Sequence, residues 1–269
     1  GGGGRPGDTD APGVAGLDVM SFASFAQLSG LVPLVGIASG YCFAGNAALL
    51  GCCDVVIATE NSNIGMAGPA MIEGGGLGVV KPTDIGPIAT QTLNGVVDVR
   101  VVDEAEAVAV ARKYLSYFQG VTTVFSRHSD DALRELVPEQ RTRVYDVRAV
   151  INTLADLDSV LELRPDFGVG IITAFARIEG RPVGIVANNP AHLGGAIDTP
   201  SADKMARFVQ LCDAFDIPLI SLCDTPGFMV GPQAEETAQV RHFSRLFVTA
   251  ASVTIPWITV VLRKGYGLG

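Results

Sequence analysis

The residues best suited to chemistry lie in a glycine-rich turn, residues 40–45, with the sequence GYCFAG. An apolar run precedes the turn, and a segment of small and apolar residues follows it. A strand that ends in such a turn and enters a helix leaves the first helical N–H groups unpaired, at the positive end of the helix dipole. The small residues Ala44 and Gly45 would let a ligand carbonyl reach those amides. The pattern predicts a backbone oxyanion site or, equally well, glycines that serve only tight helix–strand packing.

Side chains that could bind a metal are few and scattered. The three histidines, His128, His192 and His242, occur singly, and the sequence has no CxxC or HExxH motif. Zinc sites commonly use such spacings, so we predict no metal site. The five cysteines lack disulfide-framework spacing and lie in apolar contexts, which is typical of a reducing compartment, and we expect a cytoplasmic protein.

Composition argues against several classes of function. The 269 residues include 28 acidic and 19 basic side chains, a net charge of −9, so no basic excess exists to bind nucleic acid or an anionic membrane. With 48% hydrophobic residues the chain can build a large core, enough for one large or two ordinary domains. The uncharged residues 31–53 have the length of a membrane span, but Pro33 and several glycines interrupt them, which favours a buried strand followed by a buried helix.

The first half alternates strands, a glycine turn and helices. Residues 31–39 and 54–59 are apolar runs typical of buried strands, and residues 46–53 between them are typical of a helix. Residues 103–118 predict another helix, with acids in its first turn. A polar and charged stretch then indicates a surface linker. We therefore expect an N-terminal domain over 1–125, a linker over 126–145 and a C-terminal domain over 146–269.

The second half repeats this α/β plan. Ser201 is a candidate N-cap of its first long helix. The expected elements are a hairpin over 176–190, a helix over 200–215, a strand over 218–224, a helical segment over about 233–251 and a buried strand over 255–263.

Two segments, residues 33–45 and 256–269, have the same order of features: proline, buried strand, Gly-Tyr and small residues. This repeat favours two tandem domains of one fold. The chain begins GGGGRPGDTD and ends RKGYGLG, without a starting Met or a capping segment, so we expect both domains to be truncated parts of a longer protein.

Residues 35–69, VGIASGYCFAGNAALLGCCDVVIATENSNIGMAGP, resemble the oxyanion-hole segment of the crotonase superfamily. The resemblance implies that two backbone amides polarise the thioester carbonyl of an acyl-CoA, one at Gly45 with Ala44 and one from an earlier glycine loop. Where enoyl-CoA hydratases place two catalytic glutamates, this chain has Ala48 and Ala70, so water addition lacks its acid and base. The residues implied in acyl-CoA binding are Gly2, Gly3, Gly4, Gly40 and Tyr41.

The second half contains EGRPVGIVANNP, a D-x-P-G-F turn followed by a glycine and an acidic pair, HFSRLF and PWITVVLRKGYG. These motifs resemble the carboxyltransferase component of biotin-dependent acyl-CoA carboxylases, which is a beta subunit or a fused domain. The resemblance covers nearly the whole chain. It implies two tandem crotonase-like domains of the ClpP/crotonase type, built from spiral ββα units.

The resemblance implies transfer of CO2 from carboxybiotin to the α carbon of an acyl-CoA of the acetyl-CoA or propionyl-CoA type. The biotin anion takes the α-proton and the enolate attacks CO2, so the protein supplies two oxyanion holes and no side-chain base. The amides implied on the biotin side are those of Leu268 and Gly269, although the family usually has Gly-Gly-Ala after the tyrosine. The residues implied in binding there are Gly227, Phe228, Tyr266 and Gly267.

The resemblance also implies partners. These are biotin carboxylase and a biotin carboxyl carrier protein, separate or fused, with biotin carried as carboxybiotin, and further copies of the chain in a hexamer whose sites form across dimers. Two other functions stay open: the alpha subunit of a biotin-dependent acyl-CoA decarboxylase, which uses the same groups in reverse, and a non-catalytic lobe of a carboxylase complex.

Five other polar residues have modest expected roles. Asp224 shapes a strand-end turn, near the biotin site or purely structural. His192 and Glu73 are expected to be loop groups rather than a base or an acid. Arg5 and Lys264 either approach CoA phosphates or a partner chain, or are unpaired surface charges.

Overall fold

The computed structural model describes residues 20–140 and 142–269. The chain divides into two compact units, Gly1–Arg112 (unit 1) and Lys113–Gly269 (unit 2). The division falls inside a helix, Glu104–Ser116, so the linker expected over 126–145 belongs to unit 2.

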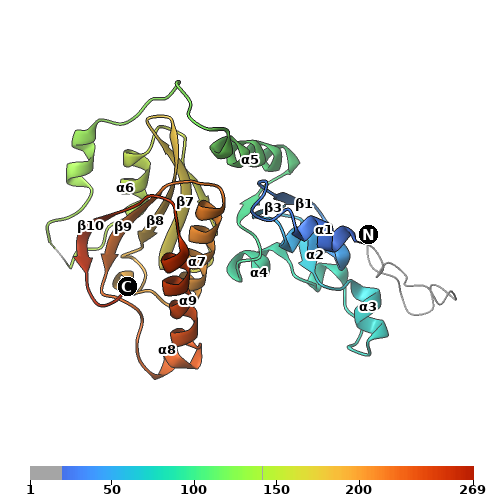
Figure 1. Cartoon of the computed structure of the whole chain (residues 1–269). Coiled ribbons are helices and arrows are strands. Elements are labelled where there is room, and N and C mark those ends of the chain that lie inside the picture. The colour runs from blue at the N-terminus through green and yellow to red at the C-terminus, as the bar shows by residue number, and fades with distance from the viewer. Residues whose placement is uncertain (1–19, 141) are drawn as a thin grey trace. The chain divides into compact units, whose positions relative to one another are not determined.

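Unit 1 combines two small sheets with short helices (Figure 1). Its elements are α1 (Ser21–Ala26), β1 (Val35–Ala38), β2 (Tyr41–Phe43), α2 (Gly45–Gly51), β3 (Val55–Thr59), β4 (Asn63–Gly65), α3 (Pro69–Gly74), η1 (Pro82–Asp84), α4 (Ile88–Leu93), β5 (Val99–Val101) and the start of α5 (Glu104–Ser116). Strands β1, β3 and β5 form a parallel sheet in the order β1-β3-β5, and β2 pairs in parallel with β4.

The core of unit 1 forms where α2 packs on the parallel sheet. Every residue of β3 is buried, and Ala47 and Leu50 of α2 lie in one cluster with Ala38 and Val56. A Cβ at Gly36 would lie 2.5 Å from Cδ1 of Leu50, so this glycine allows the helix to approach β1. The uncharged residues 31–53 thus form strands and a helix, and none of the helices within the described residues has the length and apolarity needed to cross a membrane.

Unit 2 is built on one five-stranded mixed sheet (Figure 1). Its elements are η2 (Tyr117–Gln119), η3 (Asp130–Glu135), α6 (Val147–Leu154), β6 (Leu161–Leu163), β7 (Ile171–Ile178), β8 (Arg181–Asn188), η4 (Leu193–Gly195), α7 (Thr199–Ala214), β9 (Leu219–Thr225), α8 (Pro232–Glu236), α9 (Gln239–Ser252) and β10 (Trp257–Gly265). The strand order is β10-β9-β8-β7-β6; β10, β9 and β8 run parallel, and β8, β7 and β6 pair antiparallel.

Helices cover the two faces of this sheet. Val147 and Ile151 of α6 pack in one cluster with Ile172 and Ile185 of the sheet. Phe175 points to the opposite face, where its ring lies 5.1 Å from that of Phe208 on α7. The hairpin predicted over 176–190 is confirmed as β7 and β8, which are joined by residues 179 and 180, both with positive φ, as tight hairpin turns require.

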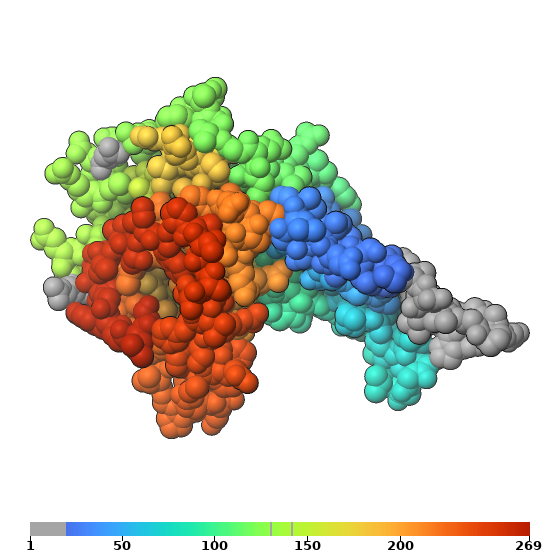
Figure 2. All heavy atoms as spheres, viewed as in Figure 1, coloured from blue at the N-terminus to red at the C-terminus, as the bar shows by residue number. Residues whose placement is uncertain are grey.

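Two expectations about the helices of unit 2 are wrong in detail. The N-cap of α7 is Asp198, whose Oδ1 accepts a hydrogen bond from the Ser201 N–H (3.1 Å), so Ser201 is not the cap. The helical segment expected over 233–251 is two helices, because Ala238 adopts a left-handed conformation (φ 59°) between them. The first of the two, α8, projects from the body of unit 2 (Figure 2).

The expected buried strand over 255–263 is present as β10, but it is not buried. Ile258 and Val261 are 63% and 59% exposed. The reason is topological: β10 lies at the edge of the sheet and pairs only with β9 among the described residues. An apolar strand sequence does not by itself distinguish an edge from a covered position.

Candidate active site

The turn predicted to bind acyl-CoA lies in unit 1 between β2 and α2. Gly40 turns the chain from β1 into β2 with φ 74°, which glycine adopts without steric cost. Ala44 has φ 54° and ψ −125°, a conformation that residues with a Cβ rarely adopt and that costs of order 1–3 kcal/mol. Its N–H donates to the carbonyl oxygen of Gly65 on β4 (3.0 Å), which helps to hold the turn in this shape. A strained turn therefore leads directly into α2.

Gly45 is the first residue of α2, and its amide is one of the N–H groups in this first turn that have no acceptor among the described residues. The first N–H groups of a helix have no intrahelical acceptor, and no group in the described part of the chain accepts from the Gly45 amide. The Ala44 N–H already donates to the Gly65 carbonyl oxygen. Of the two amides expected to bind a ligand in this turn, the Gly45 amide is therefore the candidate donor. A Cβ at Gly45 would lie 3.0 Å from Cζ of Phe22, so a side chain here would press on α1.

The other residues expected to bind acyl-CoA, or to be absent from catalysis, differ in exposure and in the element on which they lie. Tyr41 is 57% exposed and stacks on Phe43 with ring centroids 5.6 Å apart. Glu73 is exposed on α3, as expected for a surface group. Ala48 lies in α2 and Ala70 in α3, so the positions of the hydratase glutamates carry no acid or base. Gly2, Gly3, Gly4 and Arg5 lie outside the described residues.

The biotin-side turn lies in unit 2, where β9 ends. The Gly227 N–H donates to Oγ1 of Thr225 (3.0 Å), and its carbonyl oxygen accepts from the Ile197 N–H (3.0 Å). Gly227 has φ 117°, and a Cβ there would lie 3.2 Å from the carbonyl oxygen of Tyr266. Only glycine allows the two strand ends to approach this closely.

The end of β10 packs against this turn through its backbone. The Tyr266 N–H donates to the carbonyl oxygen of Thr225 (3.1 Å), and a Cβ at Gly269 would lie 3.2 Å from Cα of Gly227. The amides of Leu268 and Gly269 donate to no acceptor within residues 20–140 and 142–269. Tyr266 is 52% and Leu268 79% exposed, and the C-terminal segment lies on the surface, in dark red (Figure 2). Two successive free amides are thus presented outward.

Phe228 has a packing role in this turn. Its ring stacks on Phe243 of α9, with centroids 4.4 Å apart, and meets Phe247 edge to face at 6.0 Å. The ring therefore anchors the turn to α9. Of the residues expected on the biotin side, the structure brings together Gly227, Phe228, Tyr266, Gly267, Leu268 and Gly269.

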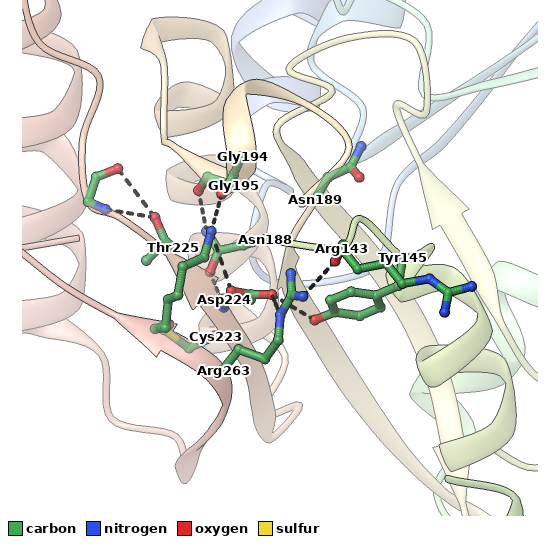
Figure 3. Close-up of polar contacts among 12 residues, drawn as sticks. Arg143, Tyr145, Asn188, Asn189, Gly194, Gly195, Cys223, Asp224, Thr225 and Arg263 are labelled. Carbon is green, nitrogen blue, oxygen red and sulfur yellow. Dashed lines mark hydrogen bonds and ion pairs between the residues drawn. The ribbon is translucent and has the colours of Figure 1, made fainter. Parts of the chain in front are cut away.

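A buried charge network lies under the biotin-side turn (Figure 3). Asp224 has no exposed surface, and its Oδ2 lies 2.9 Å from Nε of Arg263 and accepts from the Tyr145 hydroxyl (3.0 Å). Lys264 donates from Nζ to the carbonyl oxygen of Gly194 (2.6 Å) and lies 3.7 Å from Oδ1 of Asp224. Burial first, and then the Asp224 carboxylate, raise the pKa of Tyr145, so its hydroxyl keeps its proton.

Sequence reasoning missed Arg263 and Tyr145. Of its two alternatives for Lys264, the unpaired surface charge is wrong, because Lys264 pairs with Asp224 and Gly194. The sequence contained a usable signal for Arg263 and Lys264. They directly precede the glycine turn after β10, and Asp224 precedes the glycine turn after β9, the neighbouring strand.

Two of the three histidines, His192 and His242, are paired with carboxylates. Nε2 of His192 lies 2.9 Å from Oδ2 of Asp198, and Nδ1 of His242 lies 2.8 Å from Oδ2 of Asp203. His192 is therefore held at the start of α7, as a loop group rather than a base. In the described part of the chain, no three His, Cys, Asp or Glu side chains are grouped so that they could hold a metal ion.

Comparison with known families decides where this arrangement belongs. Residues 3–269 match the family described as the carboxyl transferase domain. The chain belongs to this family. The match spans both units, so the two glycine turns are parts of one carboxyl transferase domain.

Curated relatives of this carboxyl transferase domain act on acyl-CoA thioesters. It is 36% identical over 263 residues to the methylmalonyl-CoA carboxyltransferase 12S subunit of Propionibacterium freudenreichii subsp. shermanii, covering 94% of this chain and 50% of that protein. It is 34% identical over 267 residues to the propionyl-CoA carboxylase beta chain of Rhodococcus erythropolis, covering 96% and 56%. It is 31% identical over 257 residues to the methylmalonyl-CoA decarboxylase subunit alpha of Veillonella parvula, covering 91% and 50%. The chain spans about half the length of these relatives.

Solved structures share the mixed α/β fold of this carboxyl transferase domain. A single-chain, multi-domain long-chain acyl-CoA carboxylase matches with a TM-score of 0.95 and 59% identity, over 99% of this chain and 27% of that one. The transcarboxylase 12S hexamer with hydrolysed methylmalonyl-CoA bound matches with a TM-score of 0.82 and 34% identity, over 94% and 52%.

Proposed function

We propose that the protein transfers CO2 from carboxybiotin to the α carbon of an acyl-CoA. The observation that carries the proposal is the match of residues 3–269 to the carboxyl transferase domain, combined with backbone amides at both glycine turns that have no acceptor among the described residues. A backbone amide needs no change of protonation during the reaction, so it suits a step in which negative charge develops on an oxygen.

On the acyl-CoA side, Gly45 is the proposed catalytic residue. Its N–H would donate to the thioester oxygen and stabilise the enolate that forms when the α-proton leaves. Loss of one such donor typically costs about 3–4 kcal/mol of transition-state stabilisation. The strained conformation of Ala44 and its hydrogen bond to Gly65 fix the direction of the helix start, so the donor is oriented before substrate binds.

On the biotin side, the donor set fits the ureido oxygen of biotin. The amides of Leu268 and Gly269 are successive and donate to no acceptor among the described residues, and the glycines at 227, 267 and 269 place no side chain at their own positions. Carboxybiotin, when bound, supplies CO2 and then the base for the α-proton. The amides of Leu268 and Gly269 would stabilise the negative charge that this leaves on the ureido oxygen.

We further propose that the fold is two tandem crotonase-like domains. The repeat in the sequence supports this, because both repeated strands, β1 and β10, pair in parallel with a single neighbour and lead into Gly-Tyr. The five free cysteines support a reducing compartment such as the cytoplasm.

The proposed partners are biotin carboxylase, a biotin carrier and further copies of the chain. The hexamer assembly named for transcarboxylase 12S supports an oligomer in which the acyl-CoA turn of one copy faces the biotin turn of another. The 59% identity to a long-chain acyl-CoA carboxylase favours long acyl chains over the acetyl or propionyl type that the motifs first suggested. The similarity to a methylmalonyl-CoA decarboxylase alpha subunit supports the reverse direction as a second candidate.

The proposal is tested by giving the holoenzyme ATP and labelled bicarbonate with acetyl-CoA, propionyl-CoA or palmitoyl-CoA. We expect label in the α-carboxyl group of at least one product, fastest with palmitoyl-CoA, and no hydration of an enoyl-CoA. Label in no acyl-CoA, together with hydration activity, would overturn the proposal.

A further inference from the structure

We propose that Asp224 is a positioning residue for the biotin side of the site: it fixes the ends of β9 and β10 so that the amides of Leu268 and Gly269 face the ligand. This inference rests on the proposed function. It assigns a specific task to a buried charge network that has no part in the acyl-CoA turn. Figure 3 shows the side chains of Arg263 and Tyr145 converging on Asp224.

The first argument is an irregularity of the sheet. Val261 pairs with Cys223 and Gly265 pairs with Thr225, so residues 262–264 of β10 lie opposite Asp224 alone. Successive side chains of a regular strand point to opposite faces, and a bulge breaks that alternation. At this bulge Arg263 and Lys264, although adjacent, both approach the one carboxylate, at 2.9 Å and 3.7 Å. The bulge therefore brings both basic side chains to Asp224, and their pairing with Asp224 favours the bulge.

The second argument is what the network holds. The Asp224 N–H donates to Oδ1 of Asn188 (3.1 Å), which fixes the end of β9 against β8. Nη1 of Arg263 donates to the carbonyl oxygen of Arg143 (2.6 Å), and its guanidinium lies 4.6 Å from the centroid of the Tyr145 ring. Lys264 ties β10 to the loop at Gly194. The Asp224 carboxylate thus reaches two further backbone segments through Arg263 and Lys264, whereas the end of β8 is held by the Asp224 backbone N–H.

The third argument is that the network residues directly precede the two glycine turns in the sequence. Thr225 directly follows Asp224, and Gly265 directly follows Lys264, so the two glycine turns begin where the network ends. The hydrogen bond from the Tyr266 N–H to the Thr225 carbonyl (3.1 Å) joins them at that point. A buried ion pair contributes weakly to net stability, and Oδ1 of Asp224 accepts no hydrogen bond in the described part of the chain, so the role that we assign to the network concerns geometry rather than stability. Here the geometry that it fixes is that of the proposed biotin donors.

The test uses Asp224→Asn in the holoenzyme, with carboxyl transfer from malonyl-CoA or methylmalonyl-CoA to free biotin as the assay. We expect kcat/KM for biotin to fall at least about tenfold, because small misplacements of oriented donors are costly, while the Kd for acyl-CoA stays within about twofold. Hydrogen exchange at the Tyr266 amide, which donates to the Thr225 carbonyl oxygen, should become faster. Glu162→Gln is the matched control, since it weakens the close pair between Glu162 on β6, at the other edge of the same sheet, and Arg148 on α6 (2.7 Å).

Arg263→Lys provides a second variant if Asp224→Asn does not fold, because it keeps the charge and removes the bonds of the guanidinium. We expect kcat/KM for biotin to fall in this variant too, but by less than in Asp224→Asn. An unchanged kcat/KM for biotin in a folded variant, or an equal loss in Glu162→Gln, would overturn the positioning role. If the wild-type enzyme itself transfers nothing to biotin, the proposed function fails instead, and the two failures are thereby distinguished.

Discussion

The backbone N–H of Ala44 donates to the carbonyl oxygen of Gly65 at 3.0 Å, and Gly45, the next residue, begins α2 with an amide that donates to no acceptor in the described part of the chain. Two adjacent amides therefore have different tasks. One holds the strained turn, and we propose that the other donates to a thioester oxygen. This division makes the role of Gly45 testable by removing a single N–H.

Replacing Gly45 with proline should lower carboxyl transfer at least about a hundredfold, because proline has no N–H to donate to the enolate oxygen. Proline is tolerated in the first turn of a helix, but it restricts the preceding residue, here Ala44 with φ 54°, so the fold of the variant is verified by circular dichroism before the assay. Gly45→Ala is the control: it keeps the N–H, and its Cβ meets only the Phe22 ring, which is 39% exposed and can move. Turnover near the wild-type level in folded Gly45→Pro would show that this amide is not the donor.

Mixed oligomers test whether each site forms across two chains. A Gly45→Pro subunit and a subunit with proline at Leu268 and Gly269 should each be inactive alone. If the acyl-CoA turn of one chain faces the biotin turn of another, co-folded mixtures should recover part of the activity, because both defects can fall in one site and leave the other intact. Mixtures that verifiably contain both subunits and stay inactive would show that each chain builds its own complete site.

The corrected N-cap of α7 predicts a stability difference. Asp198→Ala should lower the free energy of unfolding by about 1 kcal/mol at neutral pH, and Ser201→Ala by less. Burial raises the pKa of Asp198, but hydrogen bonds from Ser201 and His192 outweigh it and leave the pKa below its usual value. The stabilisation is therefore complete above the unfolded pKa and is lost as pH falls through the lower folded pKa. Denaturant titration should thus show the deficit of Asp198→Ala shrinking under acid conditions; a deficit independent of pH would contradict the assignment.

Lys204 on α7 predicts a pH dependence of the same sign in a higher pH range. It is 2% exposed, its Nζ donates to the carbonyl oxygen of Arg164 (2.7 Å), and burial lowers its pKa to about 7. Between about pH 7 and pH 10 the unfolded chain binds the proton and the folded chain does not, so folding becomes more favourable as pH rises. The unfolding free energy of the wild type should therefore rise with pH over this range relative to that of Lys204→Met. A constant difference would show that Lys204 stays charged when folded.

The parts of the fold that could be predicted from the sequence depend on local patterns. The apolar runs at 31–39 and 54–59 became β1 and β3, and the hairpin at Glu179-Gly180 followed from its turn residues. The cap of α7 was misplaced because Asp198 and Ser201 are both good cap residues within one turn. The exposure of β10 was missed because an edge position depends on which strands pair, and not on the strand's own sequence.

For the site, the glycine turns could be found from their sequence, but the network beneath them could not. Asp224 and Arg263 are 39 residues apart, and only the parallel pairing of β9 and β10, with its bulge, brings them together. Likewise, nothing in the sequence shows that the Ala44 amide is used by Gly65 while the Gly45 amide has no acceptor in the described part of the chain. Such differences between neighbouring amides are set by tertiary contacts.

The most direct test of carboxyl transfer is the half-reaction without ATP: malonyl-CoA or methylmalonyl-CoA labelled in its carboxyl group is mixed with the holoenzyme and free biotin. The two oxyanion sites predict label in carboxybiotin and release of acetyl-CoA or propionyl-CoA, at a rate that depends on the biotin concentration. Loss of the carboxyl group at the same rate with and without biotin, or no loss at all from enzyme that binds the thioester, would contradict the account.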